Sequence, residues 1–389
     1  MREGSRPRCP TASGPSSSTA TASSISDPLG SVSDDSGQRQ SNLPPPPQCD
    51  NFGVAIICAL PLEAAAVRAL FEGRWNDAAL DRAPSDRNSY SVGSIASHAV
   101  VLVYMPRMGK VAAATVAGNL RASFRHLKLV LLVGICGGAP NSSKKPSDNL
   151  FFGDVVVSTG FIQYDYGRRL PGGFVRKDTP HDNLSGLSIA AAGLLAKLLA
   201  KLKAAEAGRT REFSHSVSRH LAALQTQLGP EKAYPGRAGD LLFQPHYLHK
   251  HHWPSECVIR AEDADTICKQ ASEESCEMFG CNQQASSLVS RSPPEQKLQP
   301  TVYFGLFASG DTVMRSAKAR DKIASQDGVI AFEMEAAGCW EILRESSCLI
   351  IKSVCDYADS HKNKTFQDYA AVVAAATAKA LLESWDARE

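Results

Sequence analysis

Short apolar runs alternate along most of the chain with segments whose apolar residues recur at helical spacing. An almost wholly apolar run such as residues 54–60 is typical of a strand covered on both faces of a sheet. The next segment, residues 61–71, has apolar residues at helical spacing and places Pro61 in the first turn of a helix. Further strands are predicted at 90–92, 99–104, 129–133, 154–158, 303–308, 329–332 and 348–354. Further helices are predicted at 110–124, 187–204, 316–325, 335–346 and 366–385.

This alternation predicts an α/β fold, a three-layer sandwich whose central mixed, mainly parallel twisted sheet is covered by helices. A single domain is expected over residues 51–386, and two stretches fall outside the pattern. Residues 1–50 are rich in Ser and Pro and cannot bury enough apolar surface to offset their ordering entropy, so we expect a disordered tail. Residues 205–300 lose the alternation and are predicted to form a partly ordered insertion.

Composition narrows the functional classes. A formal net charge of +2 in 389 residues argues against a nucleic-acid-binding protein, which normally carries a basic surface. No apolar run approaches the roughly 18 to 20 residues that cross a bilayer, so no membrane partner is predicted. The odd number of cysteines, 11, favours reduced thiols and a cytoplasmic protein. Arg2, Arg6 and Arg8 faintly resemble an organelle import signal, but nearby acidic residues weaken that alternative.

Five short segments that carry acidic residues or glycines follow predicted strands. Segments 58–63, 332–335 and 352–356 contribute carboxylates, 309–311 is Ser-Gly-Asp, and 134–138 is interpreted as a glycine-rich turn. In α/β sheets, ligands bind at the carboxyl ends of the strands. The sequence therefore predicts a ligand site at this edge of the sheet, with several carboxylates in it.

The motifs in and around these segments resemble those of the purine nucleoside phosphorylase / methylthioadenosine nucleosidase superfamily. In chain order they are Gly109-Lys110-Val111, Ser309-Gly310-Asp311, Phe332-Glu333-Met334-Glu335-Ala336 and Cys355-Asp356-Tyr357-Ala358-Asp359. The joint occurrence of several motifs in the right order is a specific signal. The resemblance covers about residues 51–385 without the insertion, and the last two motifs are most similar to those of fungal members.

The resemblance implies an enzyme that cleaves the N-glycosidic bond of a purine nucleoside or nucleotide. It implies that Asp356 protonates the purine, and burial beside Val354 and Tyr357 is expected to keep this acid protonated at neutral pH. Glu335 is implied to accept hydrogen bonds from the ribose hydroxyls. The other residues implied to contact substrate are Gly137, Gly138, Ser309, Val313, Met314, Phe332 and Met334. The chemistry needs no metal or organic cofactor, and family members commonly form homo-oligomers.

One residue after the first strand separates hydrolysis from phosphorolysis. Bacterial-type phosphorylases of the family have a phosphate-binding arginine in this stretch, whereas this chain has Glu63. A carboxylate repels phosphate but can take a proton from water. The resemblance therefore favours a nucleosidase in which Glu63 activates the attacking water. A phosphate-dependent phosphorylase and a non-catalytic nucleoside or nucleotide sensor on the same fold are the alternatives.

The group at the 5′ position of the substrate is left open by the sequence. Met105 and Met108 would suit an apolar methylthio group. Arg107 and Arg168 would instead suit a phosphate chain, because guanidinium groups bind phosphate in a bidentate manner. A nucleoside and a nucleotide are therefore both retained as candidate small-molecule partners.

The histidines and cysteines of the insertion suggest a second chemistry, a zinc site. They are His246, His249, His251, His252, Cys257, Cys268, Cys276 and Cys281. Zinc sites in sequences are usually marked by paired Cys-x-x-Cys motifs, and these cysteines lack that spacing. A flexible insertion without a metal is therefore the preferred interpretation.

Overall fold

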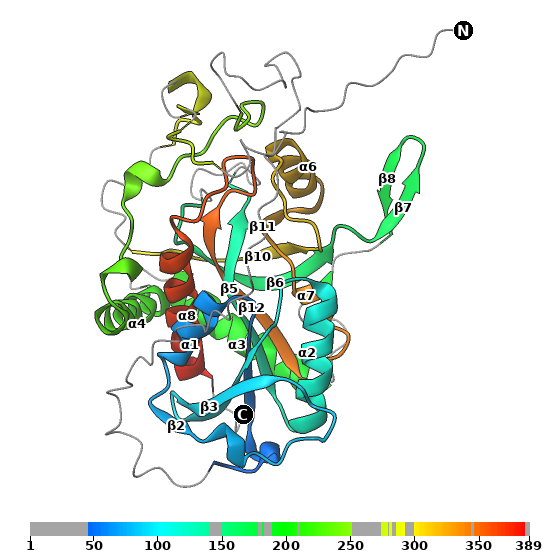
Figure 1. Ribbon diagram of the computed structural model, residues 1–389, viewed down its shortest axis with the longest axis vertical. Coiled ribbons are helices and arrows are strands. Elements are labelled where there is room, and N and C mark those ends of the chain that lie inside the picture. The colour runs from blue at the N-terminus through cyan, green and yellow to red at the C-terminus, as the bar shows by residue number, and fades with distance from the viewer. Residues whose placement is uncertain are drawn as a thin grey trace, which may run out of the picture. The chain divides into compact units, whose positions relative to one another are not determined.

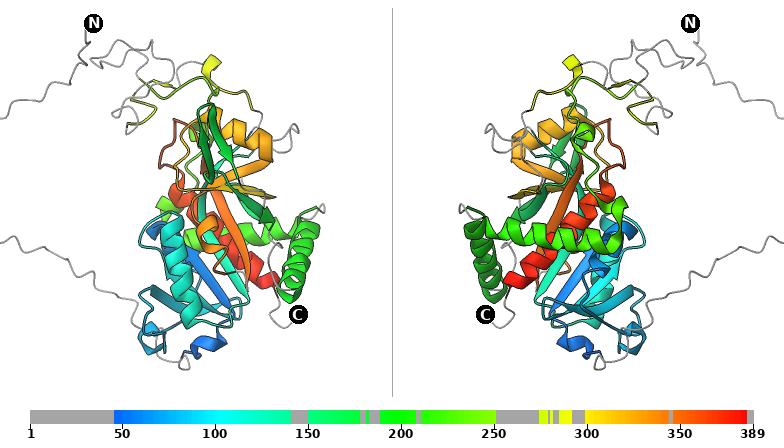
Figure 2. Two further views of the ribbon diagram at one scale, coloured as in Figure 1. Left: turned by 90° about the vertical axis from the view of Figure 1, so that its right-hand side faces the viewer. Right: turned by 90° about the vertical axis from the view of Figure 1, so that its left-hand side faces the viewer.

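The computed structural model describes most of the chain around one central sheet (Figures 1 and 2). The described residues are 46–140, 150–177, 181–182, 189–207, 211–250, 274–278, 280–281, 285–291, 299–343 and 346–385. Residues 1–45 of the predicted tail are not among the described residues. At the end of the tail region, residues Cys49–Asn51 form a short 3-10 helix. Among the helices in these ranges, none has both the length and the apolar character needed to cross a membrane.

The sheet is mixed, with parallel pairing concentrated at its centre. Its main path has the order β11-β10-β6-β12-β5-β1-β4-β3-β2. The strands are β1 Val54–Cys58, β2 Gly73–Trp75, β3 Ser89–Ile95, β4 His98–Tyr104, β5 Leu129–Gly138, β6 Val155–Gln163, β9 His181–Asp182, β10 Val302–Ser309, β11 Val329–Glu333 and β12 Ser347–Asp356. β1 runs parallel to β4 and β5, and β5 runs parallel to β12. The predicted α/β fold is confirmed.

Strand β5 extends beyond the end of β1 and changes partner there. β1 pairs with β5 as far as Leu132, and further along β5 the strand β11 pairs with it antiparallel, with Phe332 opposite Gly137. On the other side of β5, Asp356 of β12 is also opposite Gly137. In the sheet, β11, β10, β6, β12 and β5 are hydrogen-bonded neighbours in that order. The additional pairing of β11 with β5 therefore closes these five strands into a ring. The ring brings the carboxyl ends of β11 and β12 to the two sides of one glycine.

Helices cover both faces of the sheet. They are α1 Pro61–Arg68, α2 Lys110–Ser123, α3 Ile189–Ala207, α4 Glu212–Leu228, α6 Ala317–Asp327, α7 Ala336–Cys339 and α8 Gln367–Ser384. Figure 1 shows α2 and α4 on opposite sides of the sheet. The alanine-rich helix α8 is buried along most of its length and packs on β5 and β12 with one side and on α4 with another. This arrangement gives the predicted three layers.

Helix α4 lies in the stretch where the sequence predicts only partial order. Its residues Phe213, Val217, Leu221 and Leu224 are buried and recur every three or four positions, so they form one apolar face. That face packs on α8. The helix is hard to predict because Ser, His, Arg and Gln fill the positions between these residues.

Three other details differ from the sequence predictions. The segment 134–138 is not a turn but the last part of β5. The helix predicted at 335–346 is limited to α7, Ala336–Cys339. A hairpin of β7 Gly167–Leu170 and β8 Gly173–Arg176, which no pattern predicted, forms a separate two-stranded sheet that projects from the molecule (Figure 1).

Candidate active site

Glu63 is buried at the junction of β1 and α1. It lies in the first turn of α1, and its Oε2 accepts hydrogen bonds from the backbone N–H groups of Ala59 and Leu60, both at 2.9 Å. Its Oε1 accepts the N–H of Ile135 on β5 at 2.8 Å. The turn suits an acidic residue because helix N-termini present unpaired N–H groups. Glu63 therefore ties the end of β1 to the neighbouring strand.

The surroundings of Glu63 change its acidity. Burial raises the pKa of the Glu63 carboxyl above its ordinary value, although the charge of Lys352 and the backbone hydrogen bonds act in the opposite direction. A carboxylate with a raised pKa takes a proton from water more readily than an ordinary one. The site thus contains a buried group suited to act as a general base.

A buried lysine, which the sequence patterns did not single out, lies among three carboxylates. Lys352 of β12 is 3% exposed, and its Nζ donates a hydrogen bond to Oε2 of Glu335 at 2.7 Å. Burial lowers the pKa of Lys352, but the negative charges of Glu335, Glu63 and Glu333 outweigh it and raise the pKa well above its ordinary value. Lys352 therefore supplies the positive charge of a buried acidic cluster. One signal was available, since a lysine inside an apolar strand is nearly always paired.

The two acids that follow β11 have different environments. Glu333 accepts hydrogen bonds from the backbone N–H groups of Glu335 at 2.9 Å and Ala336 at 3.0 Å, at the start of α7. Burial and the negative charge of Glu335 raise the pKa of Glu333 to about 7. Glu335 is itself buried and faces Lys352. Glu333 thus has a structural role at the helix start, while Glu335 is held by an ion pair next to Glu63.

Asp356 ends β12 and is 2% exposed. Its Oδ1 accepts the backbone N–H of Ala358 at 2.8 Å, and Nζ of Lys362 lies 2.9 Å from its Oδ2. Ala358 adopts a positive φ of 51°, which turns the chain sharply after the strand. Val354 and Tyr357 are buried beside Asp356 as expected. The ammonium group of Lys362, which the sequence patterns did not single out, also lies against the carboxyl group.

Glu63 and Asp356 both lie against β5, each beside a glycine. A methyl group at Gly134 would come within 2.1 Å of Oε1 of Glu63, and one at Gly137 would come within 3.0 Å of Oδ1 of Asp356. These two positions are three residues apart on an extended strand, which corresponds to about 10 Å at ~3.3 Å per residue. Both carboxyl groups therefore contact the same strand, at two positions separated along it.

A cavity lies beside Asp356. It has a volume of about 210 Å³ and is lined by Asp356 at the end of β12, by Asp359 and Lys362 from the loop that follows, and by Phe243 and Cys276 from the insertion, among others. A larger cavity of about 410 Å³ is lined by Asp240, Arg291 and neighbouring residues and contains none of the predicted site residues. We therefore assign the candidate site from the carboxylate cluster and not from cavity size.

The remaining predicted residues fall into two groups. Ser309 and Phe332 are buried near the cluster, and Oγ of Ser309 accepts the N–H of Ala337 at 3.0 Å. Gly138 continues β5, and Met334 and Met314 are half-buried. By contrast, Arg107, Val313 and Arg168 are exposed. Arg168 lies on the projecting β7–β8 hairpin and is not part of the carboxylate cluster of its own chain (Figure 1).

Two of the family-like motifs meet at the start of α2. Nζ of Lys110 donates to both carboxylate oxygens of Asp165, at 2.7 and 2.8 Å, and the backbone N–H of Lys110 donates to Oδ1 of Asp311 at 2.7 Å. Gly109 has a φ of 106°, and a methyl group there would come within 2.9 Å of Asp311. These residues join the end of β10 to α2 and have a structural role in this arrangement.

Comparisons with known proteins found a family model and several similar proteins. Residues 53–217 match the model of a family described as the phosphorylase superfamily. The chain is 32% identical over 356 residues to a nucleotide-binding leucine-rich repeat (NLR)-like protein of Hyaloscypha variabilis. The aligned region covers 90% of this chain and only 30% of that relative, so the chain corresponds to one part of a longer protein there.

Several solved structures are also similar, at lower sequence identity. A 5′-methylthioadenosine/S-adenosylhomocysteine nucleosidase from Neisseria meningitidis is 18% identical, with a TM-score of 0.46 over 85% of this chain and 98% of the other. A futalosine hydrolase of Helicobacter pylori is 16% identical, with a TM-score of 0.47 over 86% and 98%. The match to the phosphorylase superfamily model covers less than half of the chain, so the chain resembles that superfamily over residues 53–217.

Proposed function

We propose that this domain hydrolyses the N-glycosidic bond of a purine nucleoside or nucleotide and releases the free purine. The observation that carries the proposal is the buried Glu63 carboxyl at the end of β1, which three backbone N–H groups hold in place. A phosphate ion at this position would meet a like charge in a site of low dielectric, whereas water would meet a base. Hydrolysis is therefore favoured over phosphorolysis.

The geometry supports a division of roles among the buried residues. Glu63 takes a proton from water, and the water oxygen forms a bond to C1′ of the sugar. The C1′–N9 bond breaks, its electron pair moves into the purine, and a proton delivered from the Asp356 side neutralises the leaving base. Lys362, 2.9 Å from Asp356, is a second donor at that position, so the pair acts as the acid. Glu335, fixed by Lys352, accepts hydrogen bonds from the ribose hydroxyls.

Incubating the purified chain with adenosine, methylthioadenosine, AMP and ATP, with and without phosphate, tests the proposal. Free purine and a free sugar without phosphate are expected for one or more of these substrates. Glu63→Gln and Asp356→Asn should each lower kcat by about 10²- to 10⁴-fold, the usual contribution of a general base or acid. Glu72→Gln, an exposed acid paired with Lys379, is the control and should leave kcat unchanged.

Two results would replace the proposal. Base release that strictly requires phosphate would make the domain a phosphorylase. Tight binding of a nucleoside or nucleotide without base release, unchanged by Asp356→Asn, would make it a sensor. The panel of substrates also decides the 5′ group, because methylthioadenosine and ATP differ in the apolar or anionic character of that position.

A further inference from the structure

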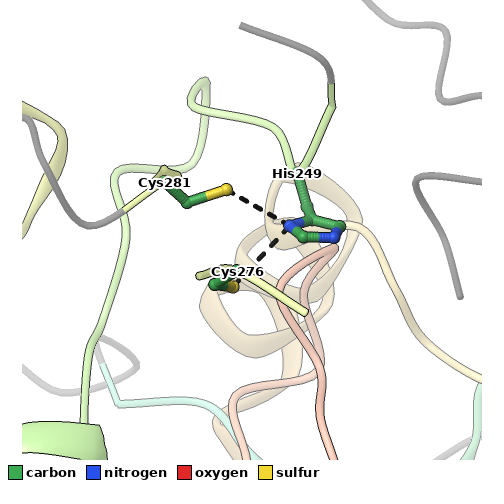
Figure 3. Close-up of side chains that lie close together, drawn as sticks. All are labelled: His249, Cys276 and Cys281. Atoms are coloured by element: carbon green, nitrogen blue, oxygen red, sulfur yellow. Dashed lines mark hydrogen bonds between the residues drawn. The ribbon is translucent and has the colours of Figure 1, made fainter. Parts of the chain in front are cut away.

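His249, which lies 27 residues before Cys276 and 32 before Cys281, converges with the two cysteines on one point (Figure 3). Nδ1 of His249 lies 3.3 Å from Sγ of Cys281 and 3.6 Å from Sγ of Cys276. The three donor atoms all lie within 4.8 Å of one another. His249 and Cys281 are buried, with exposed fractions of 3% and 0%, and Cys276 is half-buried. A nitrogen and two sulfurs are thus gathered at one largely buried point.

These separations match the dimensions of a zinc site. Zn–S bonds of about 2.3 Å and Zn–N bonds of about 2.0 to 2.1 Å give an S···N edge of about 3.6 Å in a tetrahedron. The observed S···N separations of 3.3 and 3.6 Å are close to that edge. A Cys₂His set occurs in zinc proteins, where a fourth position is taken by water or by another ligand.

The histidine is held in the orientation that metal binding requires. Nε2 of His249 lies 3.1 Å from the backbone oxygen of Glu274. Because a carbonyl oxygen only accepts hydrogen bonds, Nε2 carries the proton and the lone pair of Nδ1 faces the two sulfurs. A carbonyl bound to the second ring nitrogen is the usual support of a metal-ligating histidine.

The backbone around the two cysteines also favours a compact ligand set. The N–H of Cys281 donates to the backbone oxygen of Cys276 at 3.0 Å, and Gly280 between them has a φ of 63°. This turn brings Cys281 back toward Cys276, although the pair lacks the Cys-x-x-Cys spacing. The spacing was the reason for preferring a flexible segment, and the turn removes that objection.

We propose that His249, Cys276 and Cys281 bind a zinc ion, with the fourth position open to water or another donor. The ion would fix the insertion against the loop that follows Asp356. Several contacts already join them; for example, the N–H of His249 donates to Oγ of Ser360 at 3.0 Å, and the rings of Phe243 and His361 stack at 3.7 Å. Zinc binding goes beyond the proposed hydrolysis and does not depend on it.

The test is metal analysis of the full chain purified with zinc and then dialysed. About one zinc per chain is expected by mass spectrometry, and cobalt substitution should give the absorption bands of tetrahedral cobalt bound to thiolate. Cys276→Ser, Cys281→Ser and His249→Ala should each lose most of the metal. Cys49→Ser is the matched control, because that thiol donates to the backbone oxygen of Asp81, away from the cluster, and a hydroxyl can replace it. His215→Ala, at an exposed position, is the control for histidine.

A chelator should lower the Tm of the wild type and leave that of Cys276→Ser unchanged. Two outcomes would overturn the proposal. One is a metal content of the wild type no higher than that of folded Cys276→Ser. The other is a Cys276–Cys281 disulfide that persists when the protein is purified with reductant and zinc. If zinc binds but no base is released from any substrate, the metal site stands and the proposed hydrolysis fails, so the two are distinguishable.

Discussion

Lys352 determines the electrostatics of the candidate site, because it is a buried cation among Glu63, Glu333 and Glu335. A buried ion pair loses the hydration of both partners, so its net contribution to stability is small while both are present. Removing one partner is costly, because the other charge stays buried without compensation. Here the loss of Lys352 would leave three buried acids without a compensating positive charge.

Lys352→Met is therefore expected to destabilise the protein by about 3 to 5 kcal/mol at pH 8, measured by urea unfolding. The loss should shrink toward pH 5. The pKa of Glu333 is raised from its ordinary value of 4.5 to about 7, so its protonated form is favoured in the folded state and stability falls as the pH rises through this window. Without the lysine, this fall should be steeper.

Lys379→Met is the control for that substitution. Lys379 pairs with Glu72, whose side chain is 48% exposed, and such surface pairs contribute about 0 to 1 kcal/mol. Equal stability of the two variants at pH 8 would show that the acidic cluster does not need its cation.

The candidate residues show why sequence reasoning succeeds for some side chains and not for others. Glu63, Glu335 and Asp356 occur in motifs at the ends of strands, so their placement near one another follows from topology. The roles of Lys352 and Lys362 follow from the charges that they face in the folded chain. For Lys352 the sequence indicates that a lysine within an apolar strand has a partner, but not which acid it is.

At the scale of elements, β5 is the strand that organises the site. Its segment 134–138 contains three glycines, and these have a steric purpose in a strand, where glycine is otherwise unfavourable. The Glu63 carboxylate occupies the space that a side chain at position 134 would fill. The turn predicted from these glycines is wrong because glycine within a strand can instead mark a close approach of another group.

Gly134→Ala tests this role of the strand. The added methyl group would lie 2.1 Å from Oε1 of Glu63, so the carboxylate must move. A displacement of this kind can cost about 100-fold in rate, and we expect kcat for base release to fall by roughly that factor.

Gly118→Ala in α2 is the control, because its methyl group meets nothing within 4 Å. Since alanine is favoured over glycine in helices, that variant should keep full activity and gain about 0.5 to 1 kcal/mol. Full activity of Gly134→Ala would show that the position of Glu63 is not critical.

The core elements were predictable because their apolar residues form continuous runs or recur at regular spacing, as in β1, β12 and α8. Helix α4 and the β7–β8 hairpin were missed for different physical reasons. The helix has a narrow apolar face among polar residues, and it is stabilised by packing on α8. The hairpin has no core of its own, so hydrophobic periodicity does not apply to it.

At the scale of the whole molecule, the β7–β8 hairpin exposes apolar side chains that no contact among the described residues of a single chain buries. Its four large apolar side chains are exposed to water: Tyr166 by 51%, Leu170 by 48%, Phe174 by 44% and Val175 by 52%. An isolated two-stranded sheet is marginally stable in water, and a cluster of exposed apolar side chains usually marks a contact surface. We therefore propose that the hairpin packs on a second copy of this chain, in line with the homo-oligomers implied by the resemblance.

The variant Phe174→Ser/Val175→Ser is expected to shift the protein toward the monomer, because it removes apolar area that only association would bury. Light scattering after size-exclusion chromatography, over a range of protein concentrations, measures the mass. Arg169→Ser, on the same hairpin and exposed, changes a polar side chain and should leave the mass unchanged. If the neighbouring copy also completes the substrate pocket, activity per chain will fall with dilution in the wild type and will be low at all concentrations in the double variant. A wild type that is monomeric at all concentrations would contradict this assignment, and the exposed hairpin would then need another partner.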